Sequence, residues 1–224
     1  MRAGTPQSVR IMTADAELEG DLTLPARGCG LVVFAHGSGS SRRSPRNRYV
    51  AYRLAQEGFG TLLFDLLTES EDHDPRRRFD IPLLARRLSD VVRWLKREGL
   101  NASGVGLFGA STGSAAALIA AAELPHDIAA VVSRGGRPDL ALPYLPRVQA
   151  PTLLIVGGAD TEVIELNRMA LEHLTCRSEL RIVAGATHLF EEPGALENVA
   201  TNAVRWFERV LGSARTAPEA AQLP

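Results

Sequence analysis

The stretch Val105–Ala122, VGLFGASTGSAAALIAAA, carries the strongest structural signal in the sequence. Its first four residues form an apolar run typical of a strand buried on both faces. The small residues of 114–122 read as a helix, and the turn between strand and helix is Gly109-Ala110-Ser111-Thr112-Gly113. This is the context of a nucleophile elbow, in which two glycines remove β-carbons that would clash around a strained serine. The stretch therefore predicts a nucleophilic Ser111 at the end of a buried strand.

Seven further segments have the apolar pattern of strands, with helical patterns between most of them. The strand candidates are 9–13, 18–24, 30–35, 61–65, 129–133, 152–156 and 180–183, the first two as an antiparallel pair. The helix candidates are 49–56, 81–97, 111–123, 162–174 and 196–211. This alternation predicts an α/β fold, with a mostly parallel sheet of about eight strands flanked by helices. We expect one domain over 8–211, with flexible termini at 1–7 and 212–224.

Composition excludes several classes of protein. The chain has 224 residues, 45% of them hydrophobic and 23% charged, and a formal net charge of −1. It can therefore build one large core, and it lacks the basic character of a general nucleic-acid binder. Lys96 is the only lysine, so 24 of the 25 basic residues are arginine, which we attribute to codon usage.

Localisation and cofactors are also constrained. The apolar runs are too short to span a bilayer, and the first ten residues lack the apolar region of a secretory signal. Cys29 and Cys176 match no zinc or redox motif. We therefore expect a cytoplasmic protein with no metal and no cofactor, and with neither nucleic acid nor membrane as a partner. The sequence does not indicate an oligomeric state.

A serine hydroxyl needs a base to take its proton, and His188 is the best placed of the five histidines. It lies in a small-residue loop directly after the strand 180–183, where an open α/β sheet places its site. The other histidines are expected to be solvated or structural: His36, His73, His126 and His173.

The acid that orients this histidine should follow a strand between the serine and the histidine. Asp160 meets both conditions, because it comes just after the strand 152–156. Asp65 also ends a strand but precedes the serine. Asp139 and Glu162 are weaker alternatives.

The loop His36–Ser40, HGSGS, follows the strand 30–35 and can turn backbone N–H groups toward a developing oxyanion. We expect the N–H groups of Ser38 and of Thr112, the residue after the nucleophile, to be the two donors. A phosphate-cradling loop is the alternative, but neither a G-K-[ST] sequence nor a dinucleotide fingerprint is present.

The motifs HGSGS, GASTG, GGAD and GATH, in this order, resemble the α/β-hydrolase superfamily. Over about residues 8–211 the chain looks most similar to the dienelactone hydrolase-like branch. The resemblance implies an α/β-hydrolase fold with a triad of Ser111, Asp160 and His188. Dienelactone hydrolase itself has a cysteine nucleophile, whereas this elbow holds a serine, which favours a serine esterase over a lactone-specific enzyme.

The loops bear on the substrate. Only 134–150 separates the strands 129–133 and 152–156, so no cap domain fits there and an open site is expected. Arg134 and Arg137 follow a strand whose end faces the site, so they are candidates for contact with a substrate carboxylate or phosphate. Pairing with Asp139 or Glu71 is the alternative. Leu66 and Leu189 are among the candidate apolar contacts, and for most of these candidates ordinary packing is the alternative.

These patterns together predict a serine hydrolase that cleaves esters or thioesters of small to medium molecules through an acyl-enzyme. Three alternatives remain open: lactone hydrolysis on the same triad, acyl transfer on the same triad, and a non-catalytic module that binds a ligand or partner.

Overall fold

The computed structural model describes residues 4–26, 29–101 and 103–212. An eight-stranded sheet forms its centre, in the order β1-β2-β4-β3-β5-β6-β7-β8. The strands are β1 (Gln7–Met12), β2 (Glu17–Thr23), β3 (Leu31–Ala35), β4 (Gly60–Phe64), β5 (Val105–Ala110), β6 (Ile128–Arg134), β7 (Thr152–Gly157) and β8 (Ser178–Val183). The pairs β1–β2 and β2–β4 are antiparallel and all other pairs are parallel. The predicted mostly parallel sheet of about eight strands is confirmed.

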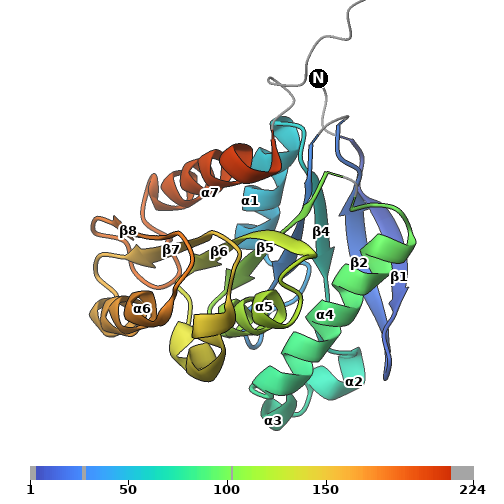
Figure 1. The fold of residues 1–224 in the computed structure, drawn as a ribbon, viewed down its shortest axis with the longest axis horizontal. Helices are drawn as coiled ribbons and strands as arrows, with labels where there is room; N and C mark the ends of the chain where they lie inside the picture. The colour runs from blue at the N-terminus through green and yellow to red at the C-terminus, as the bar shows by residue number, and fades with distance from the viewer. Residues whose placement is uncertain (1–3, 27–28, 102, 213–224) are drawn as a thin grey trace, which may run out of the picture.

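Helices cover both faces of the sheet. Figure 1 shows α1 (Pro45–Gln56) and α7 (Ala195–Leu211) on one face, and α4 (Ile81–Arg97), α5 (Thr112–Glu123) and α6 (Thr161–His173) on the other. Along β3, Leu31, Val33 and Ala35 face one apolar cluster, while Val32 and Phe34 face the other. Because successive strand residues point to opposite faces, a continuous apolar run is what such a doubly covered strand requires.

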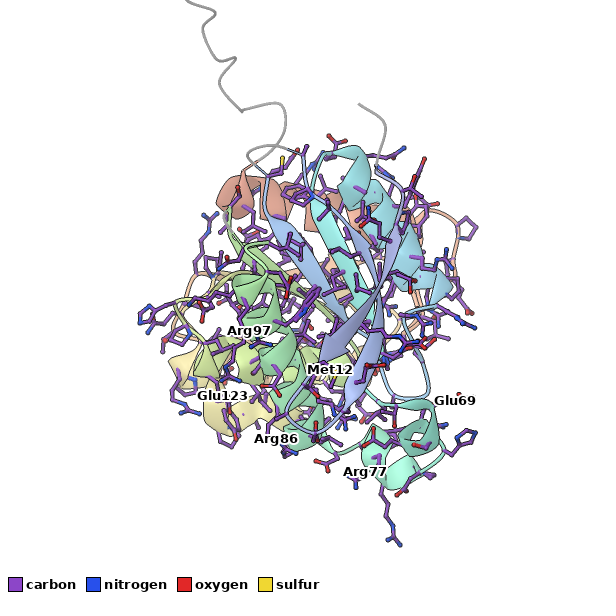
Figure 2. The ribbon with its side chains drawn as sticks, turned by 90° about the vertical axis from the view of Figure 1, so that its right-hand side faces the viewer. Met12, Glu69, Arg77, Arg86, Arg97 and Glu123 are labelled. Carbon is purple, nitrogen blue, oxygen red and sulfur yellow. The ribbon has the colours of Figure 1, made fainter. Side chains whose placement is uncertain are left out.

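Three short elements differ from the sequence-based expectation. The segment after β4 forms α2 (Glu69–Asp72) and α3 (Pro75–Arg78), and the segment between β6 and β7 forms the 3-10 helix η1 (Pro138–Arg147). In Figure 2, Glu69 and Arg77 lie at the lower right, and Arg86 lies to the left of them on α4. Since η1 packs against α5 and α6, the β6–β7 segment belongs to the helical layer and forms no cap.

Two boundaries also differ. The first helix begins at Pro45 and not at residue 49, because Ser44 caps it and proline suits its first position. Gln7, expected in a flexible end, starts β1. The expected flexible ends otherwise fall largely on 1–3 and 213–224, which lie outside the described residues.

A buried arginine fastens the α2–α3 segment to the core. Arg87 of α4 is 1% exposed and donates to both carboxylate oxygens of Glu71, at 2.7 and 2.8 Å. It also donates to Asp15 and to the carbonyl of Leu66. Hydrogen bonds from Arg87 are the main reason that the pKa of Glu71 is lowered to about 2. These bonds hold the segment that follows β4 against α4.

Candidate active site

Ser111 occupies a strained turn between β5 and α5. Its φ is +51°, a value that a residue with a β-carbon adopts only when the surroundings enforce it. A β-carbon on Gly109 would lie 2.5 Å from the Cα of Ser114, and one on Gly113 would lie 2.3 Å from the carbonyl oxygen of Ala35. Both positions therefore exclude any larger residue, as expected for a nucleophile elbow.

Hydrogen bonds hold this turn in place. The Ser111 N–H donates to the carbonyl of Arg134 at 3.2 Å, which ties the turn to the end of β6. The Ser111 carbonyl accepts from the N–H groups of Ser114 and Arg137, at 3.0 and 3.2 Å. The backbone of the elbow is thus fixed by the neighbouring strand and loop as well as by its own helix.

His188 and Asp160 are hydrogen-bonded to each other. The distance from Nδ1 of His188 to Oδ2 of Asp160 is 2.7 Å, and the Asp160 side chain is 15% exposed. The turn after β7 carries Asp160, and it is joined to the His188 loop by a bond from the Ala159 N–H to the Ala186 carbonyl at 2.9 Å. A carboxylate on Nδ1 fixes the tautomer that leaves Nε2 as a base.

Ser111 and His188 line one pocket of about 260 Å³. It lies at the carboxyl ends of the parallel strands, the place where open α/β sheets bind ligands. Its walls come from the loop after β3, the start of α1, the elbow, the end of β6 and the loop after β8: Gly37, Ser38, Ser40, Ser44, Arg46, Asn47, Ser111, Arg134, His188 and Leu189.

The alternative acids are engaged elsewhere. Asp65 accepts from the backbone N–H of Arg42 at 2.7 Å and pairs with its guanidinium. Asp139 receives a two-pronged bond from Arg137, at 2.8 and 2.7 Å. Neither of these carboxylates lines the pocket of Ser111, and neither does Glu162.

His36 is buried and bonded at both ring nitrogens. Nδ1 lies 2.9 Å from the carbonyl of Gly37, and Nε2 accepts from the N–H of Leu66 at 3.0 Å. Burial lowers the pKa of this imidazole, which keeps the ring neutral. The expectation that His36 is structural agrees with these bonds. The remaining histidines lie outside the pocket: His73, His126 and His173.

The predicted oxyanion donors lie together, but one of them is occupied. The N–H of Ser38 donates to Oγ1 of Thr112 at 2.9 Å. Thr112 is the first residue of α5, so its own N–H has no acceptor within the helix. The sequence could not indicate the Ser38–Thr112 bond, because it joins a loop to a side chain 74 positions away.

Two of the four predicted substrate contacts lie in the pocket. Arg134 lines it and is 6% exposed, and Leu189 lines it and is 39% exposed. The guanidinium of Arg137 lies on Asp139, outside the pocket wall, because the two residues are only two positions apart. Leu66 is fully buried in the core, so for this residue the packing alternative is the correct one.

Three residues of the pocket were not predicted from the sequence. Ser44, Arg46 and Asn47 come from the first turn of α1, which was expected to be loop. The available signal was Ser44-Pro45, a capping residue followed by a proline suited to the first helical position.

Neither cysteine belongs to this pocket. Cys29 is 2% exposed in the core, Cys176 is half-buried, and neither lines the pocket. Burial raises the pKa of both thiols, which disfavours the reactive thiolate. Within the described ranges, no three histidine, cysteine or acidic side chains are arranged to hold a metal. None of the described helices is long and apolar enough to cross a membrane.

Comparison with known proteins agrees with this geometry. Residues 30–178 match the family model for the alpha/beta hydrolase fold. A crystal structure of dienelactone hydrolase from Anabaena variabilis is 52% identical, with a TM-score of 0.90, over 93% of this chain and 99% of that one. An esterase of Pyrococcus furiosus is 20% identical, with a TM-score of 0.75, over 93% and 92% of the two chains, a likeness in fold alone.

Two curated proteins, from two strains of Mycobacterium tuberculosis, are each 55% identical over 202 residues and carry the provisional name phosphoribosyl transferase. The match covers 90% of this chain but 46% of each relative, so the chain spans about half their length. The family match and the high identity to a structure aligned over nearly its whole length lead to one conclusion: this chain belongs to the α/β-hydrolase superfamily and is a dienelactone hydrolase-like member of it.

Proposed function

We propose that the protein is a serine hydrolase that cleaves esters or thioesters of small molecules through an acyl-enzyme. One observation carries this proposal: a serine at φ +51° shares a pocket with a histidine whose Nδ1 lies 2.7 Å from a carboxylate. Family membership supports hydrolase activity in general. The assignment of Ser111 as nucleophile rests on the local geometry.

In the proposed reaction, Oγ of Ser111 attacks the substrate carbonyl carbon while Nε2 of His188 takes the hydroxyl proton. Asp160 accepts a hydrogen bond from Nδ1–H of His188 and stabilises the imidazolium that forms. The tetrahedral intermediate collapses as His188 returns the proton to the leaving alcohol or thiol. Water, deprotonated by His188, then attacks the acyl-enzyme and frees Ser111.

The oxyanion would form at the N–H of Thr112, the residue after the nucleophile. The N–H of Ser38 can join it if its bond to Oγ1 of Thr112 is shared or exchanged. The hydroxyl of Thr112 thus keeps the HGSGS loop beside the elbow in the resting protein. Removing one donor from an oxyanion hole typically lowers kcat by about 10²- to 10³-fold.

Lactone hydrolysis is a second candidate, because the relative that is 52% identical is named a dienelactone hydrolase. It would use the same groups, with the ring oxygen as a leaving group that stays attached. The mycobacterial relatives match this chain over less than half of their own length, so their provisional name supports no activity for it.

A fluorophosphonate probe tests the proposal directly. Wild-type protein should be labelled on Ser111, and Ser111→Ala should not. Ser70→Ala, which removes an exposed hydroxyl outside the pocket, should be labelled like the wild type. With p-nitrophenyl acetate, Ser111→Ala should lower kcat by on the order of 10⁵-fold. Folded wild-type protein that is neither labelled nor active would overturn the proposal in favour of a binding module. Comparing this ester with a lactone would then rank the two substrate classes.

A further inference from the structure

Arg134 is a buried cation without a partner, and it lies beside the nucleophile. Its side chain is 6% exposed, and its Nε is fully buried without a hydrogen bond. Among the described residues, this guanidinium has no ion pair and no hydrogen-bond acceptor. Its carbon lies 5.8 Å from the centroid of the Phe190 ring. Buried arginines normally sit on carboxylates, so an unpaired one facing a pocket indicates a missing anion.

A second arginine lines the same pocket. Arg46, in the first turn of α1, has a buried Nε without a hydrogen bond. Its only ion pair within the described ranges is a 3.3 Å contact with Glu191, whose side chain is 66% exposed and therefore well solvated. Burial, and in smaller part the charge of Arg46, lowers the pKa of Arg134 to about 10. The Arg134 guanidinium therefore remains protonated at neutral pH, and the charge of Arg46 repels it.

No acidic side chain lines this pocket to balance the two charges. The contrast with the neighbouring pocket of about 390 Å³ is direct, because five acidic residues line that one: Glu17, Glu19, Asp65, Glu69 and Asp72. The start of α1, with its partial positive charge, adds to the field in the pocket of Ser111. Asn47, buried beside it, also has a side-chain oxygen without a partner. Of these two pockets, the pocket of Ser111 is therefore the one whose lining holds arginine side chains and no acidic side chain.

We propose that Arg134 and Arg46 form a subsite for a dianionic phosphoryl group carried by the ester substrate. This proposal rests on the proposed function, since it names the substrate class of that same site. Two guanidinium groups and a helix N-terminus match two negative charges, whereas a single carboxylate would leave a net positive charge in the pocket. The phosphoryl group takes no part in the bond changes. It positions the acyl or alcohol part of the substrate against Ser111.

Three p-nitrophenyl esters of matched size separate the charge states. They are the esters of 3-phosphonopropionic acid, of succinic acid and of the neutral 4-methylpentanoic acid, compared at mildly alkaline pH where the phosphonate is a dianion. We expect kcat/KM to fall in that order, with a phosphonate-to-neutral ratio of about 10- to 100-fold. Arg134→Met and, separately, Arg46→Met should reduce this ratio by about 10-fold or more. Arg137→Met is the matched control, because it removes an arginine that already has a partner outside the pocket, and it should keep the wild-type ratio.

The three esters carry their charged group on the acyl part, so they do not test a substrate whose phosphoryl group is on the alcohol part. Binding of free anions, measured by Tm, tests the subsite in both cases. Inorganic phosphate, compared with acetate at constant ionic strength, should raise the Tm of Ser111→Ala, and this rise should disappear when Arg134→Met is added. If the neutral ester is hydrolysed but neither anion is preferred or bound, the subsite is wrong while the proposed function stands. The phosphoryl assignment is wrong if kcat/KM for the succinate ester equals or exceeds that for the phosphonate ester. It is also wrong if acetate raises the Tm as much as phosphate does. If phosphate binds through Arg134 but no ester is cleaved, the proposed function fails and the subsite stands.

Discussion

Replacing Arg134 by methionine should make the protein more stable, although it removes several hydrogen-bond donors from the pocket. The side chain is 6% exposed and has no counter-ion among the described residues, so most of its hydration is lost, and its buried Nε has no hydrogen bond to compensate. Its pKa is lowered from 12.5 to about 10, and this difference corresponds to a folding penalty of about 3 kcal/mol. The contact with Phe190 returns about 1 kcal/mol of this penalty. Methionine keeps an apolar stem of similar length, so the net gain should be about 1–2 kcal/mol.

The sign of the pH dependence follows from the direction of the shift. A base whose pKa is lower in the folded state carries its full penalty below that pKa, and the penalty is relieved only as pH rises above about 10. The stability difference between wild type and Arg134→Met should therefore be constant across neutral pH. Adding phosphate should narrow this difference, because the anion stabilises only the protein that retains the arginine.

The assay is urea unfolding, together with differential scanning calorimetry, in a buffer free of phosphate and other multivalent anions. A gain of this size should raise Tm by about 2–8 °C for a domain of this length. Arg137→Met removes a half-exposed ion pair with Asp139 and should change the stability by less than about 1 kcal/mol. A loss of more than about 1 kcal/mol in Arg134→Met would refute the reasoning, since the guanidinium would then have to be satisfied within the fold.

Three further changes test other parts of the structure. Asp160→Asn should lower kcat for p-nitrophenyl acetate by about 10⁴-fold through loss of the correct histidine tautomer. The control Asp139→Asn should keep a kcat close to that of the wild type. An unchanged kcat in Asp160→Asn would contradict the role of this residue. Gly113→Ala places a β-carbon 2.3 Å from the carbonyl oxygen of Ala35, so the free energy of unfolding measured in urea should fall by about 2–4 kcal/mol. An unchanged free energy of unfolding would mean that the elbow is not tightly packed. The pKa of Glu71 is lowered to about 2, so its contribution to stability is complete above pH 4.5 and is lost as pH falls toward 2. In Glu71→Gln the free energy of unfolding should therefore depend less on pH between 4.5 and 2. The same pH dependence as in the wild type would contradict the stabilising pairing of Arg87 with Glu71.

The parts of the site that could be predicted are those with local causes. Ser111 was identifiable because an apolar strand, a turn with two glycines and a helix follow one another within a few residues. His188 and Asp160 could be placed because each follows a buried strand, and parallel strands bring their carboxyl ends to one edge. The eight-stranded sheet could also be predicted, because short continuous apolar runs between helical patterns are typical of parallel strands that are buried on both faces.

The parts that could not be predicted depend on side-chain direction or on distant partners. Arg134 and Arg137 are three positions apart and equally basic, yet one is buried in the pocket and the other lies on Asp139. Asp139, two positions after Arg137, is a local partner for that arginine. The burial of Arg134 has no such local signal, because it depends on where β6 ends and on how η1 begins. Arg46 joined the pocket because α1 starts four residues earlier than the apolar periodicity indicated.

The bond from the Ser111 N–H to the carbonyl of Arg134 separates two roles within one residue. The backbone of residue 134 holds the turn of Ser111 in place, while its side chain lines the pocket. Any amino acid except one that distorts the strand end can supply that carbonyl. Substrate preference can therefore change at this position, by natural divergence or by directed evolution, while the elbow geometry is retained. Saturation mutagenesis at residue 134 is accordingly a rational way to vary the lining of the pocket while the elbow geometry is retained.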